Sequence, residues 1–327
     1  MNKIKTFSVE EIGNNPRLDK FLAAKFNDIT RTQIKKIIIS KNLSINNKIV
    51  SSPSQKVRIG DKISFSISEN KNEYIKPEKI KIDIVYEDND LIVLDKPSGI
   101  VVHPGAGNKS GTLVNGLVYH YNKNLSDLNG IYRPGIVHRI DKETSGLIVV
   151  AKNNFSHAKL AKQFSDHTIK RKYLALIWGV LRPLKGKIIT LISRSKKNRQ
   201  LMAVSEISGK KAITNYKTLK VFANDEIPKI SLVECVLETG RTHQIRVHLS
   251  HKGNGLIGDK KYGKQKKMKF KKINKKVEEV LKSFNRQALH AQSLGFTHPS
   301  KNRQIEFGSK LPQDFKKILD ILEKLTN

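Results

Sequence analysis

Two adjoining segments organise this chain: the loop Gly135-Ile136-Val137-His138-Arg139-Ile140-Asp141-Lys142-Glu143-Thr144-Ser145-Gly146 and the run Leu147-Ile148-Val149-Val150-Ala151. The run is short, apolar and rich in β-branched residues, with glycine before it and lysine after it, which predicts a buried strand. The residues before it combine two glycines, a Thr-Ser pair and alternating charges, which is typical of a loop. A loop that leads into a rigid strand is a common position for catalytic side chains.

Asp141 is the candidate catalytic residue of this loop. It lies between Arg139 and Lys142, and neighbouring cations favour the ionised form of an acid. A solvated loop acid in a local ion pair would have the same neighbours. The whole stretch, however, resembles the active-site loop of the RluA-type pseudouridine synthases, most closely the RluD-like ribosomal RNA enzymes. In that family the aspartate that follows His-Arg-hydrophobic is catalytic, which implies this role for Asp141.

The resemblance implies roles for further residues. In Lys172-Tyr173-Leu174-Ala175, Tyr173 is expected to line the active site and stack on the target base, although a tyrosine that opens a strand is also typical of a core. In Thr239-Gly240-Arg241, Arg241 is expected to pair with the catalytic aspartate. The same likeness suggests base flipping or RNA binding for Arg139, His138 and Lys142. The loop 96–107 is expected to form the floor of the active-site cleft. His103 in this loop is expected to be structural or to face RNA.

The implied reaction is the isomerisation of specific uridines to pseudouridine in large-subunit (23S) ribosomal RNA. It breaks the N1–C1′ bond and rejoins the base through C5, so it requires no redox change and we expect no cofactor. Asp141 could attack C1′ or remove the C2′ proton, and the sequence does not choose between them. The alternative is a non-catalytic RNA-binding or ribosome-assembly factor that retains the fold. The spacing of His243, His248 and His251 does not match a zinc motif, so we expect no metal site.

Composition points to a polyanionic partner. The chain has 327 residues, with 62 lysines and arginines against 29 acids, a formal charge of +33. The excess of basic residues occurs in both halves of the chain and is not confined to one tail. This distribution favours a nucleic acid partner, here ribosomal RNA. No apolar stretch is long enough to cross a bilayer and the N-terminus lacks a signal-peptide core. We therefore expect a cytoplasmic protein without membrane contact, which we take to be a monomer.

Three parts are predicted along the chain. Residues 14–68 contain two helices (16–27 and 31–41) and short strands, and they resemble the small RNA-binding module that RNA-modifying enzymes share with a ribosomal protein. Arg31 and Lys35 would lie on the solvent face of its second helix and bind RNA, unless the module is only a structural cap. Residues 69–80 are charged and predict a linker.

Residues 81–327 are predicted to form the catalytic domain. Many non-alternating strands and a few helices indicate an α+β fold with a mixed, mostly antiparallel sheet, the pseudouridine-synthase-like class. The segment after Thr242 is ambiguous, because its apolar spacing suits a strand or a helix. The lysine-rich residues 264–282 predict a loop or arm that either binds RNA or is disordered.

Overall fold

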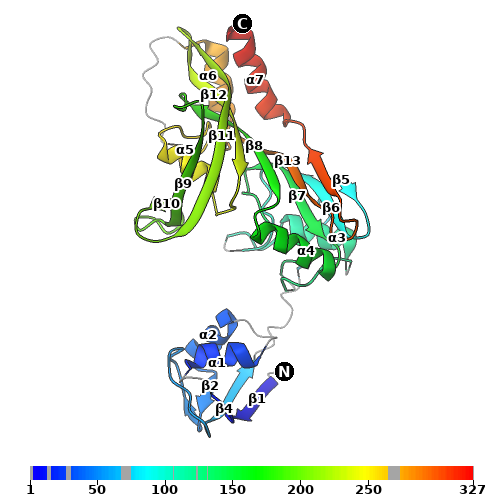
Figure 1. Ribbon diagram of the computed structural model, residues 1–327, viewed down its shortest axis with the longest axis vertical. Coiled ribbons are helices and arrows are strands. Elements are labelled where there is room, and N and C mark those ends of the chain that lie inside the picture. Colours follow the sequence, from blue (N-terminus) through cyan, green and yellow to red (C-terminus); the bar gives the residue numbers. More distant parts are fainter. Residues whose placement is uncertain are drawn as a thin grey trace. The chain divides into compact units, whose positions relative to one another are not determined.

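The computed structural model describes residues 3–12, 16–26, 31–67, 75–105, 107–122, 124–130, 132–263 and 273–326. The chain divides into two compact units, Met1–Glu73 and Tyr74–Asn327 (Figure 1). This boundary falls within the predicted linker. Its second half, however, is bound to the larger unit: Asn115 Nδ2 donates to the Lys76 carbonyl at 2.8 Å, and the Glu78 carboxylate accepts from Gly111 N at 3.0 Å. Residues 75–80 are therefore not a free linker.

The first unit contains a four-stranded antiparallel sheet in the order β1-β4-β2-β3 and two helices. Its hairpin turns at Asn46 and Asn47, which both have positive φ, as a two-residue turn between twisted strands requires. Leu22, Ile38 and Phe65 belong to its core. The elements are β1 (Lys3–Ser8), α1 (Leu18–Lys25), α2 (Arg31–Ile39), β2 (Leu43–Ile45), β3 (Lys48–Ile49) and β4 (Lys62–Ile67). Strand β1 lies outside the predicted module, because its short polar sequence becomes a strand only through pairing with β4.

The second unit is built on a ten-stranded sheet in the order β10-β9-β11-β12-β8-β13-β7-β6-β5, with β14 paired to β13. Its pairs are antiparallel except for β13 with β7, which confirms the predicted mixed, mostly antiparallel α+β class. The strands are β5 (Asp83–Glu87), β6 (Leu91–Lys96), β7 (Ser145–Ala151), β8 (Lys170–Trp178), β9 (Lys185–Arg194), β10 (Met202–Ser205), β11 (Lys210–Asn224), β12 (Ile227–Leu237), β13 (Leu289–Thr297) and β14 (Gln304–Gly308).

Helices cover both faces of the central strands, which explains why these strands do not alternate in polarity. On β8, Tyr173 and Ala175 join a core with α5, whereas Leu176 joins one with α6 and α7. The helices are α3 (Leu113–Tyr121), α4 (Asn154–Ser165), α5 (Gln244–His251), α6 (Lys275–Ser283) and α7 (Gln313–Thr326). None of the helices in the described ranges has the length and hydrophobicity needed to cross a membrane.

The sequence left the conformation of one segment open and predicted part of a second segment wrongly. The ambiguous segment after Thr242 is helix α5, because Ile245 and Leu249 pack on the same core. The lysine-rich segment 264–282 was predicted as a loop or arm. Residues 264–272 lie outside the described residues, but α6 begins at Lys275, so the loop prediction is wrong there. Val277 and Val280 lie on one helical face and are buried, and the charged face had hidden this pattern.

Candidate active site

The Asp141 loop is fixed at the point where β7 begins. Thr144 N donates to the Asp141 carbonyl at 3.1 Å, which turns the chain into the strand. Gly146 then pairs with Ala291 of β13. It has φ +111, and a Cβ atom there would lie 2.3 Å from the Ala291 carbonyl oxygen. Only glycine permits this close approach, which sets the position of the loop relative to β13.

A fully buried lysine holds the other side of the loop. Lys96 Nζ donates to the carbonyls of Pro97, Ile100 and Lys142 at 2.6, 3.0 and 3.1 Å. Gly99 N also donates to the Lys142 carbonyl, at 2.9 Å. Burial lowers the Lys96 pKa to about 7, although the nearby carboxylates of Glu143 and Asp141 oppose this shift. Residues 96–100 therefore support Lys142, the residue that follows Asp141.

The predicted residues Asp141 and Tyr173 line one cavity of about 410 Å³. The Asp141 side chain is 17% exposed, so its carboxylate can be reached from the cavity. Tyr173 is buried, and burial raises its pKa, so its phenol is neutral at physiological pH. A neutral aromatic ring in the cavity wall is suited to stacking on a nucleobase. Arg139, Arg171, Arg241, His243 and Arg246 also line the cavity.

Arg246 joins Asp141 to a second carboxylate. Its Nη1 donates to Asp141 Oδ2 at 2.7 Å, while Nε and Nη2 donate to the two oxygens of Asp259 at 2.7 and 2.8 Å. Asp259 is buried and also accepts from the amides of Lys261 and Tyr262. Burial alone would lower the Arg246 pKa, but the two carboxylates outweigh it and raise the pKa. The guanidinium is therefore charged and holds Asp141 in one orientation.

The predicted pairing of Arg241 with Asp141 is wrong, because Arg246 makes that ion pair. Arg241 Nε donates instead to the Lys211 carbonyl at 2.9 Å. Arg241 precedes α5, where Gln244 Oε1 accepts from its amide at 3.0 Å. Arg246 lies in the first turn of α5 and faces Asp141. Sequence reasoning missed it because the chain carries two arginines five residues apart, and only a helix starting at Gln244 selects the second.

His243 is a second residue that the prediction missed. It has left-handed backbone angles (φ 57, ψ 22) where α5 begins, and its Nε2 lies 3.8 Å from Asp141 Oδ1. Its Nδ1 shares a hydrogen bond with Tyr262 Oη at 2.7 Å. Burial lowers the His243 pKa against the opposing effect of Asp141, so the imidazole is neutral at physiological pH. The Thr-His-Gln turn thus adds a neutral polar ring beside the carboxylate.

The other predicted loop residues separate into exposed cations and structural groups. Arg139 and Lys142 are exposed, as an RNA contact requires. His138 stacks on Phe164 with ring centroids 4.6 Å apart, and its Nε2 accepts from Val149 N at 3.0 Å. Burial lowers its pKa to about 3, so it carries no charge for a phosphate, contrary to an RNA-binding role by charge. His103 is buried and its Nδ1 shares a hydrogen bond with the Pro104 carbonyl at 3.0 Å, which favours the structural role.

In the first unit, Arg31 and Lys35 surround a buried acid. Arg31 Nη2 lies 2.8 Å and Lys35 Nζ 3.7 Å from Asp19 Oδ2, and Arg17 Nε lies 3.0 Å from Oδ1. Asp19 is completely buried, while the three cations are nearly half exposed. These cations therefore stabilise the unit and also present positive charge to solvent.

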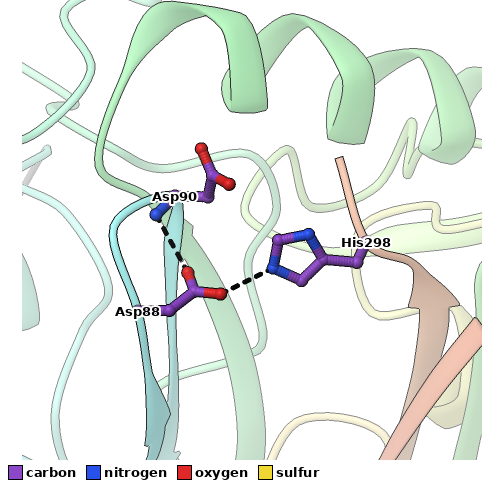
Figure 2. A group of neighbouring side chains, drawn as sticks. All are labelled: Asp88, Asp90 and His298. Carbon is purple, nitrogen blue, oxygen red and sulfur yellow. Dashed lines mark hydrogen bonds and ion pairs between the residues drawn. The ribbon is translucent and has the colours of Figure 1, made fainter. Parts of the chain in front are cut away.

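A cluster of Asp88, Asp90 and His298 has the spacing of a metal-ligand set (Figure 2). His298 Nε2 donates to Asp88 Oδ2 at 2.7 Å, and Asp88 Oδ1 accepts from Asp90 N at 2.9 Å. All four carboxylate oxygens accept from protein donors, among them Lys301 Nζ and Ser300 Oγ. The cluster therefore ties the β5–β6 turn to the β13–β14 turn.

Family models match both units of this architecture. The RNA pseudouridylate synthase model matches residues 90–251, which include the Asp141 loop, Tyr173 and the first turn of α5, and the S4 domain model matches residues 16–63. The chain belongs to the RNA pseudouridylate synthase family and is an RNA pseudouridine synthase.

Individual relatives extend along almost the whole chain. It is 42% identical to the uncharacterized RNA pseudouridine synthase YlyB of Bacillus subtilis, over 99% of both chains. It is 43% identical to ribosomal large subunit pseudouridine synthase D of Zymomonas mobilis, over 94% of this chain and 93% of the relative. Among solved structures, human RNA pseudouridylate synthase domain containing 4 matches with a TM-score of 0.55 and 25% identity, over 74% of this chain and 93% of the other. The predicted family, fold class and enzyme class are confirmed.

Proposed function

We propose that this enzyme isomerises specific uridines in large-subunit ribosomal RNA and that Asp141 is its catalytic carboxylate. One observation carries the assignment of Asp141: its carboxylate reaches the cavity, is oriented by Arg246 and shares the cavity with the neutral ring of Tyr173. Relatives from Zymomonas mobilis and Neisseria meningitidis, named ribosomal large subunit pseudouridine synthase D, support the substrate class.

The carboxylate can start the reaction in two ways. By attack, an Asp141 oxygen bonds to C1′ as the N1–C1′ bond breaks, and C5 later displaces this ester. By elimination, Asp141 takes the C2′ proton, the C1′–C2′ double bond forms, and the proton returns when C5 bonds to C1′. In both routes the electron pair of the broken bond leaves with uracil, and finally C5 loses a proton while N1 gains one. No cofactor is required by either sequence of steps.

The remaining residues would position the nucleotide. Tyr173 would stack on the flipped uracil, and exposed Arg139 would support the extruded conformation. Lys142 and Arg241, together with the cations around Asp19 in the first unit, would hold phosphates.

Because the proposed substrate is ribosomal RNA, we expect the enzyme to act in the cytoplasm. The expected monomer can be tested by light scattering.

Complementation tests the catalytic assignment. A strain lacking the gene would receive the wild type, Asp141→Asn or the control Asp320→Asn, which changes an exposed acid on α7 in the same way. Pseudouridines would be mapped in ribosomal RNA as carbodiimide adducts that stop reverse transcription. We expect the wild type and the control to restore the modification, and Asp141→Asn to restore none while it still binds RNA. Modification by Asp141→Asn would remove this residue from the mechanism.

The same experiment distinguishes a non-catalytic RNA-binding factor. If the wild type binds ribosomal RNA and restores growth but changes no uridine, the protein acts in assembly rather than in catalysis. If Asp141→Asn restores growth without modification, both roles reside in one chain.

A further inference from the structure

Arg171 is a buried cation that has no hydrogen-bond or ion-pair partner among the described residues. Its residue is 7% exposed, and it lines the same cavity as Asp141. Among the described residues none forms a hydrogen bond or an ion pair with its guanidinium, and Nε is fully buried without a partner. A buried charge without a partner is costly. Its retention in a cavity wall therefore points to a partner supplied by the substrate.

The fold holds space open for this guanidinium. Arg171 and Tyr173 are two residues apart on β8, so their side chains lie on the same face of the sheet. The guanidinium carbon lies 5.4 Å from the centre of the Phe164 ring. A Cβ atom at Gly240 would lie 2.6 Å from Arg171 Nη1, so any larger residue there would displace it. Burial lowers the Arg171 pKa, but a guanidinium remains charged at physiological pH.

The other arginines of the cavity are already engaged or lie further out. Arg246 uses Nη1, Nε and Nη2 for Asp141 and Asp259. Arg139 is exposed, and Arg241 is half-buried and bound to a carbonyl. A hydrated phosphate can reach the exposed arginines. Arg171 is buried in the cavity wall, where the edge of a planar base stacked on Tyr173 could reach its guanidinium.

We propose that Arg171 is a further catalytic residue, which donates hydrogen bonds to a uracil oxygen and stabilises the negative charge of the base when the N1–C1′ bond breaks. The inference rests on the proposed function, but it does not depend on the route, because the electron pair leaves with uracil in both. In a site with little water, a fixed donor stabilises such developing charge effectively. When C5 bonds to C1′ and N1 takes a proton, the charge disappears and the product can leave.

Small-molecule binding tests the proposal without an RNA substrate. The probe is 5-nitrouracil, a planar base that is an anion at mildly alkaline pH, and the reference is uracil, which stays neutral there. Ligand-observed NMR would give both dissociation constants. We expect the wild type to prefer the anion by about tenfold or more, Arg171→Met to lose this preference and Arg171→Lys to keep part of it. The control Lys172→Met, on the opposite face of β8, should behave as the wild type.

Equal affinity of the wild type for the two bases would overturn the proposal, and so would an unchanged preference in Arg171→Met. If Arg171→Met does not fold, the comparison of the wild type with Arg171→Lys decides instead, and an unchanged preference in Arg171→Lys would contradict the proposal.

Single-turnover kinetics with ribosomal RNA adds a second test. We expect Arg171→Met to lower the rate of the chemical step about 10²–10³-fold, the size of a lost oxyanion donor, with an unchanged RNA dissociation constant. A weaker RNA affinity with an unchanged rate would show a phosphate contact instead and contradict the proposal. If the wild type modifies no RNA, the proposed function fails, while the base-binding test still decides the role of Arg171.

Discussion

The two units use opposite arrangements of buried charge. In the first unit, the buried acid Asp19 is surrounded by three partly exposed cations. In the second, the buried cation Arg246 is held between the fully buried Asp259 and the partly exposed Asp141. The first arrangement leaves positive charge at the surface, where phosphates can be bound. The second leaves an oriented carboxylate at a cavity, where it can react. The group that remains accessible differs, and so does the function that it can serve.

The largest effect is expected from Arg246→Met. It leaves the buried Asp259 and the cavity carboxylate without their common cation, so the unfolding free energy of the second unit should fall by about 3–5 kcal/mol. Modification activity should also be lost. Arg241→Met is the matched control, and chemical denaturation should show a change below about 1 kcal/mol, since only a carbonyl contact is lost. If the two variants lost equal stability and activity, the result would support the pairing of Arg241 with Asp141 that the sequence predicted.

In the first unit, Asp19→Asn should give a smaller and strictly local effect. The amide leaves Arg17, Arg31 and Lys35 without their counterion, and the unit should lose about 2 kcal/mol. Hydrogen exchange followed peptide by peptide would show faster exchange in α1 and α2, with no change in β7 and β8. Loss of protection in both units would show that they do not unfold independently.

A pH dependence is expected from His248, which is fully buried between the hydroxyl groups of Thr214 and Thr190, each 2.9 Å away. Burial lowers its pKa to about 4. Between this value and the ordinary value of about 6.5, the unfolded chain binds more protons, so stability must fall as the pH decreases through this window. Within this window, His248 should lower the free energy of unfolding by up to about 1.4 kcal/mol for each unit by which the pH falls. Denaturation of His248→Asn should show a flatter pH profile, whereas exposed His251→Asn should not.

The smallest effect is expected from the exposed cations of the first unit. Lys35→Met should weaken RNA binding slightly and reduce the salt slope by less than about 0.7–0.9, the value for one phosphate contact, because Asp19 shares its charge. Filter binding at several salt concentrations would measure this slope. Lys20→Met, on the exposed face of α1, is the control. A full unit of slope lost with Lys35 would mean that its ion pair with Asp19 is broken in the complex.

Much of the fold was predictable because local sequence patterns indicate many of its helices and strands. The buried run at β7 and the helices α1 and α2 were recognisable, since each segment has a clear apolar pattern and clear boundaries. Strand β1 is short and depends on pairing with the distant strand β4. Strand β10 is short and weakly patterned, and it forms only by pairing with β9. Helix α6 was concealed by its lysines.

The site was predictable to the same degree. The Asp141 loop and Tyr173 lie in recognisable motifs, and the structure brings both to one cavity. The choice between Arg241 and Arg246 depended on whether the segment was helix or strand, which the local sequence left open. The partner Asp259 and the unpaired state of Arg171 depend on contacts between distant segments, which no local pattern contains.

The burial of Lys96 has a practical consequence. Amine-reactive labels should modify the many lysines at the surface of the folded enzyme but not this one, whose buried amino group is enclosed by three carbonyls. Its labelling requires the strand end and the loop to separate, so the rate measured by mass spectrometry would report how often this region opens. A bound RNA fragment that stabilises the loop should slow the reaction, which makes this amine an internal probe of substrate engagement.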